Sequence, residues 1–366
     1  MVVAIFVVLE IAVRLFFSRP GIVVRNEENN PQAMPYLLDQ YENHKGLKVA
    51  CIGSSVMQGY LNSWDDRAFP AMAEKILRKK YGYKNLKTFN FATAGNTFGD
   101  HLCVLNRVLK DDPDLIVHAV HFKLFSSFRP TPIARTDNAY YLLGHPELAA
   151  YLQRFNISTR DWVKIYLSGK VGDAWHTYGY RDLMSLLMFG TKKVPQKEIA
   201  DAFHELFGFV SQEAMLARLN TPEEHNQEYL WKLLPQVLVA KHFEICGNFD
   251  FTDNNPSWVS FNDGAKLAAL HDQSVMYYMT PINRPFVEEM NFFNWERVVP
   301  VMKERVYQVT RQYDHQILDY TQAVDPAYFS DTDHINMAGH KQVASRLAKD
   351  IDRRLTSRKH RAAKEK

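Results

Sequence analysis

Cysteine is scarce in this 366-residue chain, which holds only Cys51, Cys103 and Cys246. Three widely separated thiols can form at most one bridge, so the disulfide framework of a small secreted domain is excluded. A CxxC pair and a Cys/His cluster are both missing, which argues against structural zinc. We therefore expect the cysteines to be small buried side chains, and we expect neither a metal nor another cofactor.

A surplus of one charge is missing as well. The 44 Lys and Arg residues nearly balance the 41 Asp and Glu residues, for a net charge of +3, which argues against a nucleic-acid partner. Only the C-terminal end is strongly basic, since residues 353–366 hold seven Lys or Arg against one Glu. We assign residues 356–366 to a solvated basic tail, with contact to anionic lipid or an acidic glycan as the alternative.

Long apolar runs are missing except at the N-terminal end. Residues 2–17 read VVAIFVVLEIAVRLFF, broken only by Glu10 and Arg14, which are four apart and can pair on one face of a helix. Such a helix is roughly 24 Å long, slightly short of a hydrocarbon core of roughly 30 Å. We assign residues 1–20 to a membrane anchor helix, which a start further upstream would lengthen, and residues 21–46 to a linker. A cleaved signal peptide and an amphipathic helix packed on the protein are the alternatives.

The rest of the chain alternates short apolar runs with helical patterns, which is typical of a parallel α/β sheet. Strands are predicted at 47–52, 88–93, 114–122, 274–280 and 315–320, and helices at 67–81, 100–110, 295–313 and 336–355. Residues 47–123 and 265–355 should therefore form a doubly wound, flavodoxin-like sheet of five parallel strands. Its ligand site is expected at the carboxyl ends of the strands.

The alternation stops between residues 124 and 264, where helical patterns and aromatic residues dominate. We interpret this segment as a large, mostly helical insertion that caps the α/β domain. Within it, Trp175, Tyr178, Tyr180 and Arg181 could line a sugar-binding cleft, or they could form the core of the cap.

Ser55 follows the first predicted strand in the sequence Gly53-Ser-Ser-Val-Met-Gln-Gly59. A serine at such a turn projects its hydroxyl into the crevice at the carboxyl end of the sheet, where it can act as a nucleophile. The segment lacks the Lys-Ser/Thr ending of a phosphate-binding loop. Ordinary turn chemistry is the alternative interpretation.

The last predicted strand is followed by Asp331-Thr-Asp-His334. Residues three apart in such a segment can place a carboxylate beside the imidazole, which fixes its tautomer while the other nitrogen faces the nucleophile. Asp331 is the expected partner and Asp333 the adjacent alternative, while either could instead cap the final helix. The joint position of Ser55 and His334 after the first and last strands favours a Ser-His-Asp triad.

Two further histidines, His118 and His121, could suggest a metal pair. They are three apart on a predicted strand, where side chains alternate with a period of two. They should therefore face opposite sides of the sheet, which argues against a shared metal.

These motifs resemble those of the SGNH/GDSL hydrolases. The segment from Gly53 to Gly59 is similar to the first block of that family, Gly95 to the glycine of the second, and residues 331–340 to the last. The resemblance covers the α/β parts of the chain. It implies that Ser55 is the nucleophile, that His334 is the base oriented by Asp331, and that the N–H groups of Ser55 and Gly95 stabilise the oxyanion.

The chain departs from the family pattern at two places. Ser54 replaces the aspartate of the first block, a change that resembles the membrane-anchored branch of the family that acylates teichoic acid or exopolysaccharide. His121-Phe-Lys123 stands where the third block has Gly-x-Asn-Asp. Lys123 is the expected substitute donor for the oxyanion, with an ordinary strand-end lysine as the alternative.

By this resemblance we expect a membrane-anchored enzyme with an extracytoplasmic catalytic domain, periplasmic or at the cell surface. It would remove or transfer an acyl group, most simply acetyl, on a cell-surface polysaccharide through an acyl-Ser55 intermediate. Its partners would be a carbohydrate or acyl-ester substrate, the membrane and a membrane O-acyltransferase. The alternative is a catalytically weak accessory protein that binds a glycan or such an acyltransferase.

Overall fold

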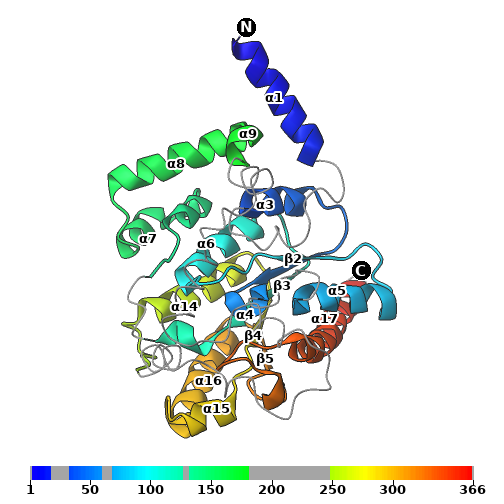
Figure 1. Ribbon diagram of the computed structural model, residues 1–366, viewed down its shortest axis with the longest axis vertical. Helices are drawn as coiled ribbons and strands as arrows, with labels where there is room; N and C mark the ends of the chain where they lie inside the picture. Colours follow the sequence, from blue (N-terminus) through cyan, green and yellow to red (C-terminus); the bar gives the residue numbers. More distant parts are fainter. Residues whose placement is uncertain (1, 18–32, 60–67, 127–131, 181–247, 365–366) are drawn as a thin grey trace, which may run out of the picture.

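Five parallel strands form a single sheet in the order β2–β1–β3–β4–β5 (Figure 1). The computed structural model describes residues 2–17, 33–59, 68–126, 132–180 and 248–364. The strands are β1 (Lys48–Ile52), β2 (Lys87–Asn90), β3 (Leu115–Val120), β4 (Val275–Met279) and β5 (Gln316–Asp319). The predicted doubly wound α/β fold is therefore confirmed, and each strand lies within one residue of its predicted start.

The centre of the sheet is buried on both faces, which explains its continuous apolar sequence. All residues of β3 and β4 are buried. In the register of the three central strands, Ala50 of β1 pairs with Ile116 of β3, and Ile116 pairs with Val275 of β4. The core of the protein therefore lies on both sides of these strands.

Helices cover both faces of the sheet (Figure 1). On one face α5 (Phe69–Lys80) packs against α17 (Met337–Lys364), and on the other α6 (Phe98–Leu109) packs against α14 (Pro256–Leu270). The helix α16 (Trp295–Gln312) contacts α14 and β5. The apolar face of α5 holds Phe69, Ala73 and Leu77, all fully buried, at the spacing that a helix requires of one face.

Two predicted boundaries differ most from the structure. The strand β2 ends at Asn90 rather than at 93, because the Asn90 side chain donates to the carbonyl of Met57 and accepts from the N–H of Ala92. The helix α17 continues to Lys364, through most of the predicted basic tail. Part of this extension is fixed by Arg358, which donates to the carbonyl of Asp114.

The described parts of residues 124–264 are mostly helical, as expected. They form the short helices η3 (Phe122–Phe125) and η4 (Thr136–Leu142) and the helices α7 (Leu148–Arg154), α8 (Thr159–Ala174) and α9 (His176–Gly179). The division of the chain into segments stays a prediction, and α14 crosses the boundary expected between 264 and 265.

The apolar N-terminal segment forms the helix α1 (Val2–Phe17), which projects from the α/β body beside α9 (Figure 1). The expected pair is present, since Nε of Arg14 lies 2.7 Å from Oε1 of Glu10. Between residues 2 and 364, leaving out the gaps named above, no helix is both long and apolar enough to cross a bilayer.

Candidate active site

Ser55 is held at the carboxyl end of β1 by a tight turn. After Ile52 the chain passes through Gly53 and Ser54 and starts the one-turn helix α4 (Ser55–Gln58) at Ser55 itself. A Cβ on Gly53 would lie 2.9 Å from the Cβ of Ala119 in β3, so only glycine fits this close approach. The turn therefore presents the Ser55 side chain at the strand end, as the sequence predicted.

The imidazole of His334 bridges Ser55 and Asp331. Its Nε2 lies 2.9 Å from Oγ of Ser55, and its Nδ1 lies 2.6 Å from Oδ2 of Asp331. A carboxylate only accepts hydrogen bonds, so Nδ1 carries the proton and Nε2 is left to accept from the Ser55 hydroxyl. The structure thus brings together the three residues that the sequence singled out, in the arrangement of a nucleophile, a base and an orienting acid.

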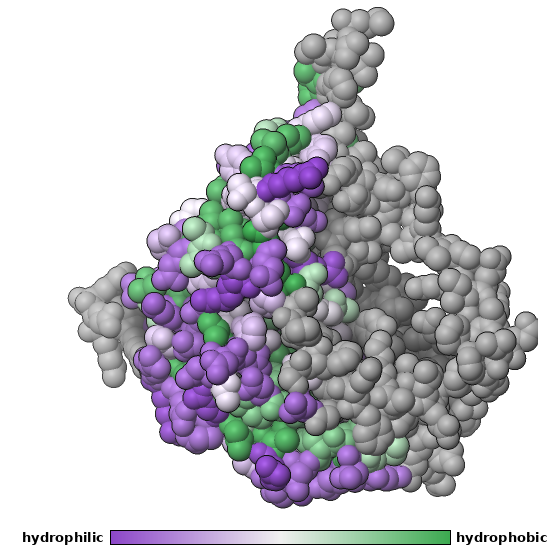
Figure 2. Space-filling view, turned by 90° about the vertical axis from the view of Figure 1, so that its left-hand side faces the viewer, coloured by the Kyte–Doolittle hydropathy of each residue, from purple (hydrophilic) through white to green (hydrophobic). Residues whose placement is uncertain are grey.

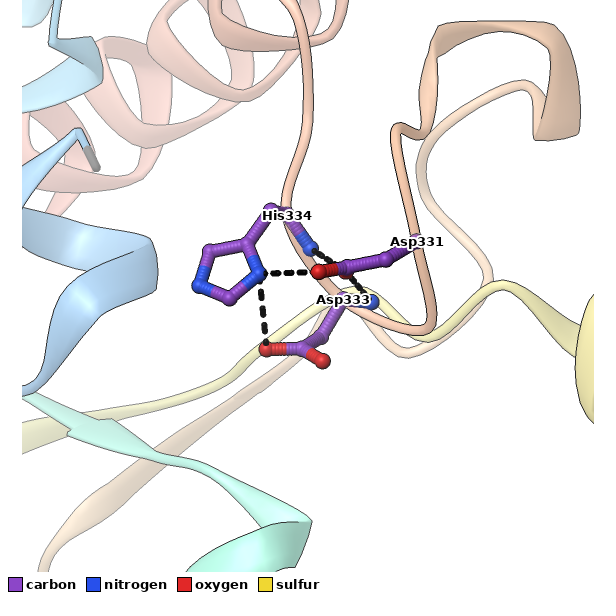
Figure 3. A group of neighbouring side chains, drawn as sticks. All are labelled: Asp331, Asp333 and His334. Atoms are coloured by element: carbon purple, nitrogen blue, oxygen red, sulfur yellow. Dashed lines mark hydrogen bonds and ion pairs between the residues drawn. The ribbon is translucent and has the colours of Figure 1, made fainter. Parts of the chain in front are cut away.

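The Asp331 carboxylate is fixed by its own loop. Its Oδ1 accepts from the backbone N–H of Asp333 at 2.9 Å and from that of His334 at 2.8 Å, so Oδ2 points at the imidazole (Figure 3). Burial opposes ionisation, but the charge and hydrogen bond of His334 outweigh it and lower the pKa of Asp331 to about 2. Asp331 is therefore a carboxylate at neutral pH.

A second carboxylate lies on the same side of the ring. Oδ2 of Asp333 is 3.8 Å from Nδ1 of His334, so both acids face Nδ1 while Nε2 points away from them (Figure 3). Burial opposes protonation of His334, but Asp331 and Asp333 outweigh it and raise its pKa above the ordinary value of 6.5. Asp331 is the hydrogen-bonded partner, and Asp333 adds charge at longer range.

The carboxylate of Asp333 contacts two basic side chains, Lys123 and His121. Nζ of Lys123 forms an ion pair with Oδ1 of Asp333, and Nε2 of His121 lies 2.9 Å from Oδ2. All three side chains are buried. Burial alone would raise the pKa of Asp333, but the positive charge of Lys123 is the largest of the opposing effects and holds it well below its usual range.

This contact gives Lys123 a different environment from the one we expected. The sequence suggested that Lys123 donates to the oxyanion beside Nε2 of His334, yet its ammonium is paired with the carboxylate that faces Nδ1. A buried ammonium stays where its counter-charge is, because separating the two in a low-dielectric interior is costly. Lys123 is therefore paired on the Nδ1 side of His334, and its role as an oxyanion donor stays a prediction.

The loop after β2 is tied to the turn that holds Ser55. The side chain of Gln58 accepts from the N–H of Ala94 at 2.7 Å, and the carbonyl of Gly53 accepts from the N–H of Thr93 at 3.2 Å. Gly95 follows with φ of +83°, a conformation that favours glycine. These links place the predicted second-block glycine next to α4.

One buried carboxylate that supports this loop was missed. Asp100, in the first turn of α6, accepts from both the N–H and the hydroxyl of Thr97, from Asn138, and from the N–H groups of Ala134 and Arg135. Arg135 in turn donates to Oδ1 of Asn96 and to the carbonyl of Ala94. The Thr-x-x-Asp pattern of a capping box could have pointed to Asp100. Its contact with η4 joins segments far apart in the chain and is evident only from the tertiary structure.

His118 and His121 have separate surroundings. Nε2 of His118 lies 3.0 Å from Nδ1 of His101 in α6, while His121 faces Asp333. Burial lowers the pKa of His101 to about 3 and that of His118 well below 6.5, so this pair is neutral at physiological pH.

Asp331, Asp333 and His334 are the described group whose ligand atoms come close enough to hold a metal, all within 4.8 Å of one another. Each already has a partner in the protein. The proton on Nδ1 of His334 is shared with Asp331, and Lys123 supplies a positive charge to Asp333. A cation here would have to displace both the Nδ1 proton and the ammonium of Lys123. The arrangement therefore fits an imidazole protonated at Nδ1 better than a metal centre.

The aromatic residues suggested for a sugar cleft are only partly described. Tyr180 is buried and bonds to Asp39, while the rings of Trp175 and Tyr178 stack at 6.3 Å. Arg181 lies outside the described residues. A cleft of about 740 Å³ is lined by residues of α8 and α9 and reaches Thr93 and Arg135 beside the Gly95 loop.

Comparisons with known proteins leave the family open. No protein-family model matches the chain, and no curated protein matches it in sequence. Among solved structures, LAE5, described as an alpha/beta hydrolase enzyme from the metagenome of Lake Arreo in Spain, is 12% identical. The match covers 83% of this chain and 94% of LAE5, with a TM-score of 0.34. A similarity this distant carries no argument about activity, so the chemistry of the site rests on its own geometry.

Proposed function

We propose that this protein is a serine esterase or O-acyltransferase of the SGNH/GDSL type, with Ser55 as nucleophile, His334 as base and Asp331 as the acid that orients it. The observation that carries the proposal is the hydrogen-bonded series from Oγ of Ser55 through His334 to Asp331, with distances of 2.9 and 2.6 Å. Three residues from opposite ends of the sequence meet in the relation that acyl transfer requires.

In the proposed reaction Oγ of Ser55 attacks the carbonyl carbon of an ester while Nε2 of His334 takes the hydroxyl proton. The oxyanion is stabilised by the N–H groups of Ser55 and Gly95. At Ser55 such a group lies in the first turn of α4, where N–H groups have no partner within the helix. The C–O bond of the ester then breaks, and His334 returns the proton to the departing alcohol, which leaves an acyl-Ser55 ester.

The second half of the reaction decides between the two activities. Attack of water on acyl-Ser55 releases a carboxylic acid, whereas attack of a sugar hydroxyl forms a new ester. The substrate we propose is an acyl group, most simply acetyl, on a cell-surface polysaccharide. The cleft that reaches Thr93 and Arg135 is large enough for a drug-sized ligand, and we assign it to the part of the carbohydrate remote from the ester, because its lining does not include Ser55 or His334.

The proposed location follows from α1. Its 16 residues are almost all apolar, and we propose that they hold the protein at a membrane with the α/β domain outside the cytoplasm. A membrane O-acyltransferase is the protein partner we propose, because an enzyme tethered in this way would receive its acyl groups across the membrane.

The test is covalent labelling and turnover. The full-length protein should react with a fluorophosphonate at Ser55 and hydrolyse a small acetyl ester, and Ser55→Ala should abolish the adduct and lower kcat by at least about 10⁴-fold. Ser54→Ala is the matched control, because the buried Ser54 hydroxyl has no hydrogen-bond partner among the described residues. This variant should keep both the fluorophosphonate adduct and the ester hydrolysis. Full turnover by Ser55→Ala would refute the proposal, and absence of any adduct in the wild type would favour the accessory binding protein.

A further inference from the structure

Exposed apolar side chains are concentrated on two helices. Among the described residues ten large hydrophobic side chains are exposed, and all but Leu270 and Val301 lie on α1 or α8. Those on α1 are Val7, Val8, Ile11 and Leu15, and those on α8 are Val163, Tyr166, Leu167 and Val171. Single exposed apolar residues scattered over a surface are ordinary, whereas a cluster of them marks an interaction surface.

The helix α8 has one packed face and one apolar exposed face. Its packed face holds the buried Ile165 and also Gly169, where a Cβ would come within 2.4 Å of the Tyr140 ring. Val163, Leu167 and Val171 are spaced by four residues on another face and are 48%, 55% and 40% exposed. The inner contacts therefore fix the rotation of α8 and leave this second face outside.

Basic residues flank the apolar face of α8. At about 100° per residue, Arg160, Lys164 and Lys170 fall within or beside the arc that runs from Val163 to Val171. All three are exposed, and Lys164 forms an ion pair with the exposed Asp161. A mixture of aliphatic and basic side chains on one helix face is the pattern that binds the interface of an anionic bilayer.

The helix α1 presents its apolar face at the same end of the molecule. Its inner side is set by Glu10, whose Oε1 accepts from the N–H of His176 at 3.0 Å, and by the buried Val13. His176 opens α9, which follows α8 directly, so α1 and α8 are linked through α9. Both helices lie at the end opposite α15 (Arg284–Glu289) and α16 (Figure 1). Figure 2 shows apolar residues among hydrophilic ones on the upper part of the face where α8 lies.

We propose that the apolar and basic face of α8 docks on an anionic phospholipid bilayer, together with the exposed face of α1. The α/β domain would then be held in a fixed orientation by two contacts rather than on a single tether. The proposal rests on the membrane location proposed above, but it does not depend on the chemistry of Ser55.

The experiment uses the full-length protein with a single labelled cysteine in a Cys246→Ser background. Cys51 and Cys103 are buried and should not react. An environment-sensitive fluorophore at Val163→Cys should shift to the blue on vesicles that contain phosphatidylglycerol. The matched control is Val301→Cys on α16, because this valine is 47% exposed, close to the 48% of Val163, and lies at the opposite end. The fluorescence of the label at Val301→Cys should not shift on the same vesicles.

A second set of variants tests the energetics. Val163→Glu combined with Leu167→Glu should weaken partitioning into these vesicles by roughly tenfold or more, while Val301→Glu should leave it unchanged. Turnover of a soluble acetyl ester should be the same in all three proteins, so loss of docking is distinguished from failure of the proposed chemistry. The proposal would be overturned by equal fluorescence shifts at the two labelled cysteines, or by an equal shift at Val163→Cys on neutral vesicles. A shift that depends on protein concentration in the absence of lipid would also overturn it, because it would indicate that a second copy of this chain covers the face.

Discussion

The buried ammonium of Lys123 forms an ion pair with the carboxylate of Asp333. These residues are separated by most of the chain. Lys123 lies in η3 directly after β3, and Asp333 lies between the proposed orienting acid and the proposed base. Because Oδ2 of Asp333 is 3.8 Å from Nδ1 of His334, the pair contributes to the electrostatics of the site without touching Ser55.

The two acids near His334 should differ sharply in their effect on turnover. Asp331→Asn should lower kcat by about 10⁴-fold, because the amide no longer fixes the tautomer that leaves Nε2 free to accept a proton. The matched control is Lys123→Met combined with Asp333→Asn, which removes the second acid and its counter-charge together. This control should keep kcat within about tenfold of the wild type at high pH. A larger loss in the control than in Asp331→Asn would reverse the assignment of the orienting acid.

The pH dependence of kcat/KM should report the raised pKa of His334. A general base acts only when it is neutral, so activity should rise with pH through an apparent pKa above 6.5. Asp333 raises this pKa more strongly than Lys123 lowers it. The double variant should therefore move the acid limb to lower pH, as measured with a soluble ester between about pH 5 and 9. A limb that does not move would show that the pair has no electrostatic influence on the base.

The ion pair itself should matter for stability mainly when one partner is removed. Lys123→Met leaves a buried, uncompensated carboxylate and should lower the free energy of unfolding by about 3 to 5 kcal/mol. Adding Asp333→Asn should restore much of this loss. Lys303→Met is the control, since Lys303 and Asp319 form a partly exposed pair at 2.8 Å, which should contribute less than about 1 kcal/mol. Urea unfolding measures all three, and equal losses in the two lysine variants would contradict a buried pair.

Gly95 should be needed for activity more than for stability. Gly95 and Gly82 have nearly the same φ, +83° and +78°. Apart from the chain neighbours, a Cβ on either would meet no heavy atom of the described residues within 4 Å. Alanine at each position should therefore lower stability similarly, by about 1 to 2 kcal/mol from backbone strain. Only Gly95→Ala should reduce kcat, by up to about 10²-fold, because it displaces an N–H proposed to stabilise the oxyanion. Equal kcat values for the two variants would argue against that donor.

Much of the fold could be predicted from local patterns. The five strands were recognised because parallel strands buried on both faces read as short apolar runs, and the helices between them show one apolar face. The predicted boundaries differ from the structure where side chains from elsewhere in the chain intervene. Asn90 ends β2 through a bond to Met57, and Arg358 extends α17 through a bond to Asp114, and neither partner is evident from the sequence.

For the site, the sequence by itself determined the three proposed reacting residues, because strand ends of a parallel sheet converge and the motifs of Ser55 and His334 follow the first and last strands. Only the tertiary structure decided which carboxylate contacts Nδ1, that Lys123 is paired with Asp333, and that Asp100 supports the loop of Gly95. The physical reason is that spacing along the chain constrains which strand end a residue occupies. The partner of a buried charge depends instead on atoms brought together from distant segments, where a low dielectric makes each pairing obligatory.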